Sequence, residues 1–485
     1  MAKARGKSVA QVQPDQVLSV IADYVVRNAV YPVAAMKMAR YCLMDALGCA
    51  LQAFASAECT RHLGPVVAGT VVPNGARVPG TRFQLDPAKA AFDISCLIRW
   101  FDFNAVWFTG GSPADTLGTV LAVADYVSRM EVARGGKAMR MKEVMRYLIK
   151  AYEIHGMLSG ANKIDRSDIG LDSTLLVKIT AAAIATKMLG GNRDQIINAL
   201  SHVFVDQQAL DLYRIHPHTG PRKSWAAADA ARRGVQFALF SIGGEKGYPT
   251  AISTKHWGFR DVQFKGKEFN PPPQLGSHVV KHVQFKLAFP TQRHCQSAAE
   301  CAVALHPEII ARLDQIERIE IYTHGLAARI VNVSGPLKNY AARDHCMQYI
   351  VAVALLYGGI TTDSYGDAFA ADPRIDALRA RMIIREEPAY TNGHHDPEIR
   401  SNPNAQQIFF RDGSATRKVE VIYPIGDSHR RRADLPLLEQ KFRDNLARHF
   451  APRRRQQLYE LLSSQQRLEA VAMDKFMDML VDKFD

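Results

Sequence analysis

The residue types best suited to holding an anion are concentrated in one short stretch, residues 213–229. It places His216, His218, Arg222 and Lys223 in a loop broken by proline and glycine, directly before an alanine-rich segment that is expected to form a helix. The first N–H groups of a helix are unpaired and its dipole is positive there, so anions bind at that end. The stretch therefore predicts a carboxylate-binding site; the alternative is an ordinary solvated turn.

Two further polar stretches could supply groups for proton transfer. Asp102 and Asn104 stand at the end of an expected helix, where a carboxylate could act as a general base. The alternative is that Asp102 makes only local hydrogen bonds in a loop. Residues 340–349 form a polar start to an apolar helix and contain Asp344 and Tyr349. Asp344 could equally be a helix cap.

The length and charge of the chain limit the classes of function. With 485 residues it exceeds what one hydrophobic core normally serves, so two domains are expected. The formal net charge of +13 could indicate nucleic acid, but part of the excess lies in local runs at residues 429–432 and 453–455, without a nucleic-acid motif. A small anionic substrate explains part of the charge equally well. We expect no nucleic-acid partner, and DNA binding stays an alternative that salt-dependent affinity would reveal.

Cysteine usage and the N-terminus indicate the compartment. The seven cysteines lie in apolar segments without a CxxC pair, so neither a disulfide framework nor a zinc or iron–sulfur site is indicated. The N-terminus is basic but lacks the apolar core of a signal peptide, and no apolar run is long enough to cross a membrane. We expect a cytoplasmic protein with reduced thiols, no metal and no membrane association.

Apolar residues recur at helical spacing through the first half of the chain, without strand alternation. The expected helices span residues 14–28, 33–54, 87–100, 112–130, 141–158, 173–189, 193–210 and 226–242. Residues 65–84, rich in valine, glycine and proline, are expected to be extended or to form short strands. An all-helical first domain over residues 14–275 follows.

A proline-rich linker at residues 271–273 precedes a second unit of mixed character. Strands are expected at residues 279–289, 316–322 and 418–423, and helices at about 293–305, 345–357 and 373–382. This α+β lid is expected over residues 276–432, and residues 433–485 are expected to return to the helical domain. The predicted fold class is mainly α, with a smaller α+β lid.

A cleft between a helical domain and a lid is a natural place for a small-molecule site. Asp102, Lys223 and Tyr349 could converge on such a cleft from three remote segments. His294 is a further candidate, and the alternative for it is an ordinary partly buried histidine.

Six phrases of the sequence resemble the MmgE/PrpD family. They are residues 41–48, 63–80, 98–104, 222–227, 343–349 and 423–426, and the resemblance extends over nearly the full length. It implies a helical domain with a smaller lid, a homodimer, and no metal, cofactor or iron–sulfur cluster. It also implies a lyase that removes water from 2-methylcitrate, or a related tricarboxylate, to give 2-methyl-cis-aconitate in propionate catabolism.

The resemblance also assigns roles to residues. Asp102, Lys223 and Tyr349 match active-site positions of the family, and we expect Lys223 to bind a substrate carboxylate while Asp102 and Tyr349 share the proton transfers. The expected substrate-binding residues are Asn104, Arg222, His216, His218 and His294. Elimination of water from a tricarboxylate needs cations for the carboxylates, a base for the carbon-bound proton and an acid for the leaving hydroxyl.

Three positions depart from the family pattern. Ala105, Ser112 and Ser173 stand where the family has an aspartate and two histidines. Serine is a poor acid or base at neutral pH, so each missing histidine is expected to reduce proton transfer by roughly 100- to 10,000-fold. The alternative function is therefore an impaired or inactive relative that binds a tricarboxylate or pairs with an active paralogue. His216, His218 or His155, which stand at other positions, could compensate.

Overall fold

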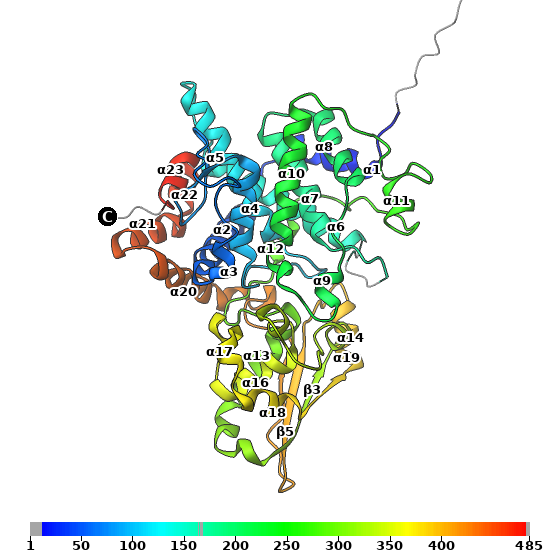
Figure 1. The fold of residues 1–485 in the computed structure, drawn as a ribbon, viewed down its shortest axis with the longest axis vertical. Helices are drawn as coiled ribbons and strands as arrows, with labels where there is room; N and C mark the ends of the chain where they lie inside the picture. Colours follow the sequence, from blue (N-terminus) through cyan, green and yellow to red (C-terminus); the bar gives the residue numbers. More distant parts are fainter. Residues whose placement is uncertain (1–11, 163, 165–167, 482–485) are drawn as a thin grey trace, which may run out of the picture.

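A bundle of helices forms the larger part of the molecule, at the top of Figure 1. The structure is a computed structural model that describes residues 12–162, 164 and 168–481. The long helices of this part are α1 (Gln16–Val26), α2 (Val33–Gln52), α4 (Pro87–Arg99), α5 (Leu117–Ala133), α6 (Met141–Asn162), α7 (Thr174–Met188), α8 (Arg193–Val205) and α10 (Ala226–Ile242). The single-turn helices are α3 (Ala57–Thr60), α9 (Leu212–Ile215), α11 (Phe259–Val262) and α12 (His278–His282). The apolar periodicity of the sequence predicted each of these long helices. Helix α8 ends at Val205, earlier than the predicted end at residue 210.

Capping residues determine where two of these helices begin. The side chain of Asp86 accepts hydrogen bonds from the N–H groups of Ala88 and Lys89, and a proline occupies the first position of α4. Asn192 and Gln195 form a reciprocal capping box at the start of α8. Both helices thereby satisfy N–H groups that have no partner within the helix.

The centre of the bundle is the close packing of α7 against α10. Most of α7 is buried, and apart from Lys178 and Lys187 its side chains are small or apolar. A Cβ atom added to Gly234 of α10 would lie 2.5 Å from the Cβ of Ala181 and 2.7 Å from the carbonyl oxygen of Lys178. Only glycine allows so close an approach of the two helices.

The lid, at the bottom of Figure 1, is built on a mixed sheet of four strands in the order β4-β3-β5-β6. The strands are β3 (Ile316–Thr323), β4 (Met382–Glu386), β5 (Asn404–Phe410) and β6 (Val419–Val421). β4 is parallel to β3, whereas β5 is antiparallel to both β3 and β6. Its helices are α13 (Gln296–Ile309), α14 (Gly325–Ile330), α15 (Tyr340–Arg343), α16 (Met347–Tyr357), α17 (Asp367–Ala370), α18 (Pro373–Arg379) and α19 (Pro388–His395). The prediction of a mainly helical protein with a smaller α+β lid is confirmed.

The strand expected at residues 279–289 is not present. Val279 and Val280 belong instead to the single turn α12 and are buried, and among residues 279–289 only Gln284 forms an isolated bridge, with Val106. The carboxylate of Glu153 accepts hydrogen bonds from the N–H groups of Gly276 at 2.9 Å and Val279 at 2.8 Å. These hydrogen bonds satisfy the N–H groups at the start of the turn. The tertiary contact therefore overrides the β propensity of the valines.

After the lid, the chain continues in four helices that pack on the helical domain. The returning helices are α20 (Arg431–His449), α21 (Pro452–Ser463), α22 (Gln465–Ala470) and α23 (Met473–Asp478), and their apolar side chains join the core of the first domain. On α20, the buried Nζ of Lys441 donates hydrogen bonds of 2.8 Å to the carboxylate of Asp45 and to the carbonyl oxygens of Phe103 and Lys286. The proposed limits of the three segments stay a prediction.

Two further properties concern the whole described chain. The seven cysteines are all buried and unpaired. Among the described helices, none combines the length and the apolar character that crossing a bilayer requires.

Candidate active site

The candidate site is built around Asp102, just after α4. The strands β1 (Ala76–Arg77) and β2 (Gln84–Leu85) pair with each other and line neither of the two cavities described below. Asp102 is buried and adopts a left-handed backbone conformation, with φ at +51°. Its Oδ1 accepts hydrogen bonds from Arg99 at 2.6 Å and from the Nζ of Lys286 at 2.7 Å, and its carbonyl oxygen accepts a second one from Lys286 at 2.6 Å. These bonds hold a conformation that is uncommon outside glycine.

The surroundings of Asp102 are strongly cationic. Besides Arg99 and Lys286, the Nζ of Lys223 lies 3.6 Å and the Nε2 of His345 3.8 Å from Oδ2 of Asp102. Burial by itself raises the pKa of this carboxyl, but the charges of Arg99, Lys286 and Lys223 outweigh burial and hold its pKa well below the usual range. Asp102 is therefore ionised, and it is a weak base.

Lys223 joins the helical domain to the lid. It lies in the 3-10 turn η3 (Pro221–Ser224), just before α10, and its side chain is completely buried. Its Nζ forms an ion pair with the carboxylate of Asp344 from the lid, while also facing Asp102. The structure therefore brings the stretches around Asp102, Lys223 and Asp344 together.

Asp344 and His345 form a carboxylate–imidazole pair at the edge of the site. Oδ1 of Asp344 lies 2.5 Å from Nδ1 of His345. Because an ionised carboxylate only accepts hydrogen bonds, Nδ1 carries the proton and Nε2 keeps its lone pair. Burial lowers the pKa of His345 more than the neighbouring Asp344 raises it, so the ring is neutral. The side chain of Asp344 thus binds Lys223 and His345 and does not cap α16, whose N-cap residue is Cys346; the backbone of Asp344 is instead the C-cap of α15.

A cavity of about 510 Å³ lies beside these residues, between the helical domain and the lid. The cationic side chains that line it are Arg99, Arg214, Lys286, Arg293 and Arg329. The carboxylates that line it are Asp102, Asp115 and Asp211. Burial lowers the pKa of Lys286 to about 8, so its ammonium is an acid of useful strength near neutral pH. The cavity suits an anion that carries several carboxylates.

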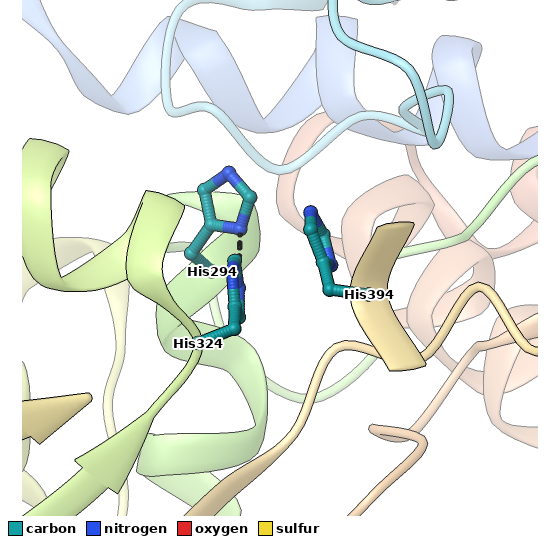
Figure 2. Close-up of side chains that lie close together, drawn as sticks. All are labelled: His294, His324 and His394. Carbon is teal, nitrogen blue, oxygen red and sulfur yellow. Dashed lines mark hydrogen bonds between the residues drawn. The ribbon is translucent and has the colours of Figure 1, made fainter. Parts of the chain in front are cut away.

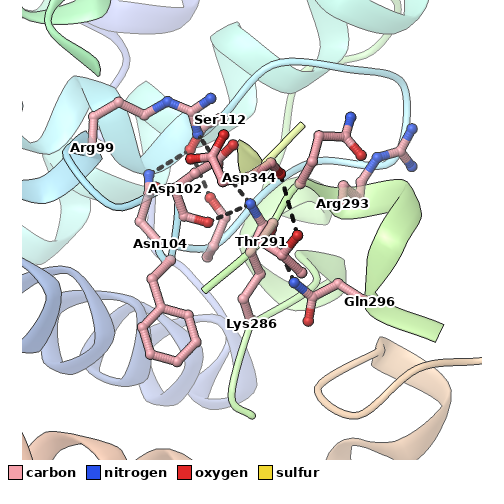
Figure 3. A network of polar contacts seen from close by, with 12 residues as sticks. Arg99, Asp102, Asn104, Ser112, Lys286, Thr291, Arg293, Gln296 and Asp344 are labelled. Carbon is pink, nitrogen blue, oxygen red and sulfur yellow. Dashed lines mark hydrogen bonds and ion pairs between the residues drawn. The ribbon is translucent and has the colours of Figure 1, made fainter. Parts of the chain in front are cut away.

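Asn104 and Ser112 belong to a polar network in one wall of the cavity, shown in Figure 3. The amide of Asn104 donates hydrogen bonds to Oγ of Ser112 at 2.7 Å and to Oδ1 of Asp115 at 2.9 Å. Ser112 in turn donates to the carbonyl oxygen of Ala105 at 2.7 Å. Burial raises the pKa of Asp115. Ser112 and Asp115 line the cavity, whereas Asn104 holds them in place from behind.

The other predicted residues are divided between three places. His218 and His294 line the central cavity. Arg222 and His216 line a second cavity of about 930 Å³, which His218 also reaches. Tyr349 lies in the core of the lid, where its hydroxyl donates to the carbonyl oxygen of Ser364 at 2.6 Å, and it does not line either cavity. The structure therefore brings Asp102 and Lys223 together but not Tyr349.

His294, His324 and His394 gather beside the cavity (Figure 2), close enough to raise the question of a metal site. The rings of His324 and His394 are stacked at 3.8 Å with an interplanar angle of 16°, so their lone pairs run side by side instead of converging on one point. Nδ1 of His294 lies 3.0 Å from Nε2 of His324, and Nδ1 of His394 donates to the carbonyl oxygen of Ser401 at 2.7 Å. Burial lowers the pKa of His394 to about 3. The trio fits hydrogen-bonded packing of neutral rings better than coordination.

Sequence reasoning missed several residues of the cavity wall, among them Arg99, Arg214, Lys286 and His345. Arg99 and His345 lie inside phrases that carry the family resemblance, and Arg214 lies in the predicted anion-binding stretch. These three could have been found there. Lys286 stands in a β-branched and aromatic stretch that was predicted to be a strand, and no local pattern distinguishes it.

Fold and site together define an α-helical protein with an α+β lid over a cationic cavity, and comparison with known proteins identifies its family. Residues 19–272 match the MmgE/PrpD N-terminal domain and residues 289–465 match the MmgE/PrpD C-terminal domain. The chain belongs to the MmgE/PrpD family.

Three relatives show how far the similarity extends. The chain is 46% identical over 481 residues to a protein of Salmonella typhi named 2-methylcitrate dehydratase, covering 98% of this chain and 99% of that protein. It is 46% identical over 466 residues to the 2-methylcitrate dehydratase of Escherichia coli K12, covering 95% and 96%. It is 43% identical over 480 residues to the mitochondrial 2-methylcitrate dehydratase of Yarrowia lipolytica, covering 98% and 92%.

Proposed function

We propose that this protein is a 2-methylcitrate dehydratase, a hydro-lyase of propionate catabolism. It removes water from 2-methylcitrate, or a closely related tricarboxylate, and gives 2-methyl-cis-aconitate. The observation that carries the proposal is the match over nearly the full length to relatives of that name. The cavity supports it, because a volume of about 510 Å³ is in the size range of small-molecule sites.

The cavity wall provides the charges that a tricarboxylate requires. Arg99, Arg214, Lys286, Arg293 and Arg329 line it from both the helical domain and the lid. Guanidinium groups bind carboxylates through paired, charge-assisted hydrogen bonds. Lys223 is already paired with Asp344 behind this wall, so its part in the proposal is to fix Asp344 and neutralise Asp102.

The elimination needs a base on one side of the forming double bond and an acid on the other. In the proposal, Nε2 of His345 takes the proton from the methyl-bearing carbon, and Asp344 stabilises the imidazolium that forms. The electrons of the C–H bond become the second bond between the two carbons, and the C–O bond breaks. The hydroxyl leaves as water with a proton from the ammonium of Lys286. Atoms and charge balance without an oxidant or a cofactor.

This assignment differs from the roles that the family resemblance gives to Asp102 and Tyr349. The cations around Asp102 lower its pKa and make it a weak base, and the phenol of Tyr349 is bound to the backbone of the lid. Catalysis by Asp102, Lys223 and Tyr349 stays a prediction, and variants described in the Discussion separate the two assignments.

A cytoplasmic homodimer completes the proposal. Buried free thiols are typical of proteins in a reducing compartment. Leu210 and Leu212 are exposed at the larger cavity, and Ile215 is exposed beside them. An apolar group of this kind suits a surface that a second copy covers. Light scattering of the purified protein tests the subunit number.

The test of the function is direct. Purified protein is mixed with 2-methylcitrate, and the ultraviolet absorbance of the conjugated product is followed. We expect turnover that the variant His345→Gln lacks. Retained binding of 2-methylcitrate without any product would instead support the alternative of an inactive relative.

A further inference from the structure

His155 is a buried side chain in the cavity wall for which the proposed elimination has no role. It lies on α6, only 1% of its surface is exposed, and it lines the central cavity. Neither of its ring nitrogens has a hydrogen-bond partner within the part of the chain that the structure describes. Buried polar atoms are almost always paired, so two unpaired nitrogens at a cavity indicate that the partner is a bound molecule.

The neighbouring loop is shaped to make room for this ring. Gly111 has φ at +75°, and a Cβ atom added there would lie 2.6 Å from Nε2 of His155. The imidazole therefore lies against the backbone next to Ser112, which also lines the cavity. Residue 112 is a serine where the family pattern has a histidine. His155, which comes from α6, places an imidazole in the same wall of the cavity.

The charge state of His155 decides what it can recognise. Burial alone lowers its pKa to about 3, with no contribution from a charged neighbour, so the ring is neutral. A neutral imidazole has one donor nitrogen and one acceptor nitrogen. A carboxylate only accepts hydrogen bonds, and five cationic side chains of the same cavity serve it better. An alcohol both donates and accepts, which matches an uncharged imidazole.

We propose that His155 binds the hydroxyl group of the substrate, the group that leaves as water. The inference rests on the proposed function for the identity of this hydroxyl. The unprotonated nitrogen of His155 accepts the hydrogen of the hydroxyl. The lone pairs of the hydroxyl oxygen are then free to receive the proton of Lys286. His155 thus selects hydroxylated tricarboxylates over those without the hydroxyl.

The test compares two ligands that differ by this one group: citrate and propane-1,2,3-tricarboxylate. Their dissociation constants are measured by titration calorimetry in a His345→Gln background, so that neither is converted. With His155 present, citrate is expected to bind roughly 10- to 100-fold more tightly, the value of a buried polar group that keeps or loses its partner. In His155→Phe this preference is expected to fall to about one, because phenylalanine keeps the ring but lacks both nitrogens, while propane-1,2,3-tricarboxylate binds as before.

Three controls keep the result interpretable. His155→Gln retains a donor and an acceptor and is expected to keep most of the preference. His202→Phe replaces a histidine of α8 that lines neither cavity and is expected to leave the preference intact. If the phenylalanine variant does not fold, His155→Ala replaces it with the same expected loss.

An equal loss of affinity for both ligands in His155→Phe would show that the ring only packs the wall, and the inference would be wrong. The same holds if the background protein binds the two ligands equally. Because the readout is binding, it is independent of turnover. A wild-type protein that leaves 2-methylcitrate unchanged but shows the hydroxyl preference contradicts the proposed function and not this inference.

Discussion

Lys223 and Asp344 form a buried ion pair between the helical domain and the lid, although 121 residues separate them in the chain. The same ammonium also faces Asp102, and Asp344 also holds His345. Lys223 therefore fixes the carboxylate that orients the imidazole, and it shares the neutralisation of Asp102 with Arg99 and Lys286. Four of the following predictions examine this arrangement.

Lys223→Met is expected to destabilise the protein, since it leaves Asp344 buried without its main cation. Removing one partner of a buried pair costs about 3 kcal/mol or more in the free energy of unfolding. Urea denaturation measures the change. The matched control is Lys142→Met, which breaks a largely exposed pair with Glu469 and is expected to cost at most about 0.5 kcal/mol. Equal effects of the two variants would contradict a structural role for Lys223.

Asp102→Asn is expected to lower stability in a pH-dependent way. Because the pKa of Asp102 is depressed in the folded protein, its ionised form contributes stability above its unfolded pKa, and this contribution is lost as the pH falls through the folded pKa. The stability difference between wild type and variant is thus expected to be constant from neutral pH to about pH 5 and to shrink only below about pH 4. Urea midpoints across this range measure it. A difference that grows as the pH falls from 7 to about 5 would mean that the folded pKa is raised instead of depressed.

The affinity for tricarboxylates is expected to fall as the pH rises through about 8, where the ammonium of Lys286 loses its proton. The sign follows from the chemistry: the protonated form binds a carboxylate, and the neutral amine does not. Dissociation constants of citrate between neutral pH and pH 9 or so measure the effect. Lys286→Met is expected to bind more weakly throughout and to show no such step. A step that persists in this variant would assign it to another group.

His345→Gln is expected to lower kcat by roughly 100- to 10,000-fold, the range for loss of a general base, with a much smaller effect on KM. Asp344→Asn is expected to give a smaller drop, because the imidazole remains but loses the carboxylate that orients it. Steady-state kinetics with 2-methylcitrate measure both. A variant with an unchanged kcat and a raised KM would make His345 a binding group instead.

Tyr349→Phe separates the two assignments of the catalytic groups. Its hydroxyl is bound to the carbonyl oxygen of Ser364 and does not line either cavity, so we expect kcat to stay within about threefold of wild type. The lost hydrogen bond is expected to cost about 1 kcal/mol in stability. A loss of activity of 100-fold or so in a folded variant would restore Tyr349 to the catalytic role that the family resemblance implies.

The helices of this protein could be predicted because each one carries several turns of apolar periodicity, and its ends carry local signals such as Asp86 before a proline. The turn at Val279 could not be predicted from the sequence, because the side chain that caps it belongs to Glu153, 126 residues away. Local propensity carries no information about a partner so distant. The same limit applies wherever tertiary contacts decide between a helix and a strand.

The candidate site was predictable in part, and for a related reason. Asp102 and Lys223 stand in polar stretches that chemistry singles out, and both reach the same cluster. Tyr349 stands in a similar stretch, but the sequence does not tell toward which side of its helix the phenol points. Lys286 owes its lowered pKa to burial, which the charge of Asp102 only partly offsets, and its position to a hydrogen bond with Asp102, which precedes it by 184 residues.

Because of Lys441, the order in which the ribosome makes the segments of the chain matters for the completion of the site. Its helix is made after the lid, yet its ammonium holds the backbone next to Asp102 and the backbone of Lys286. The ribosome must therefore have made α20, near the end of the chain, before these hydrogen bonds can form. A nascent chain that stops after the lid would contain a complete lid but a helical domain without α20. We expect chaperones and proteases to act on such shortened chains.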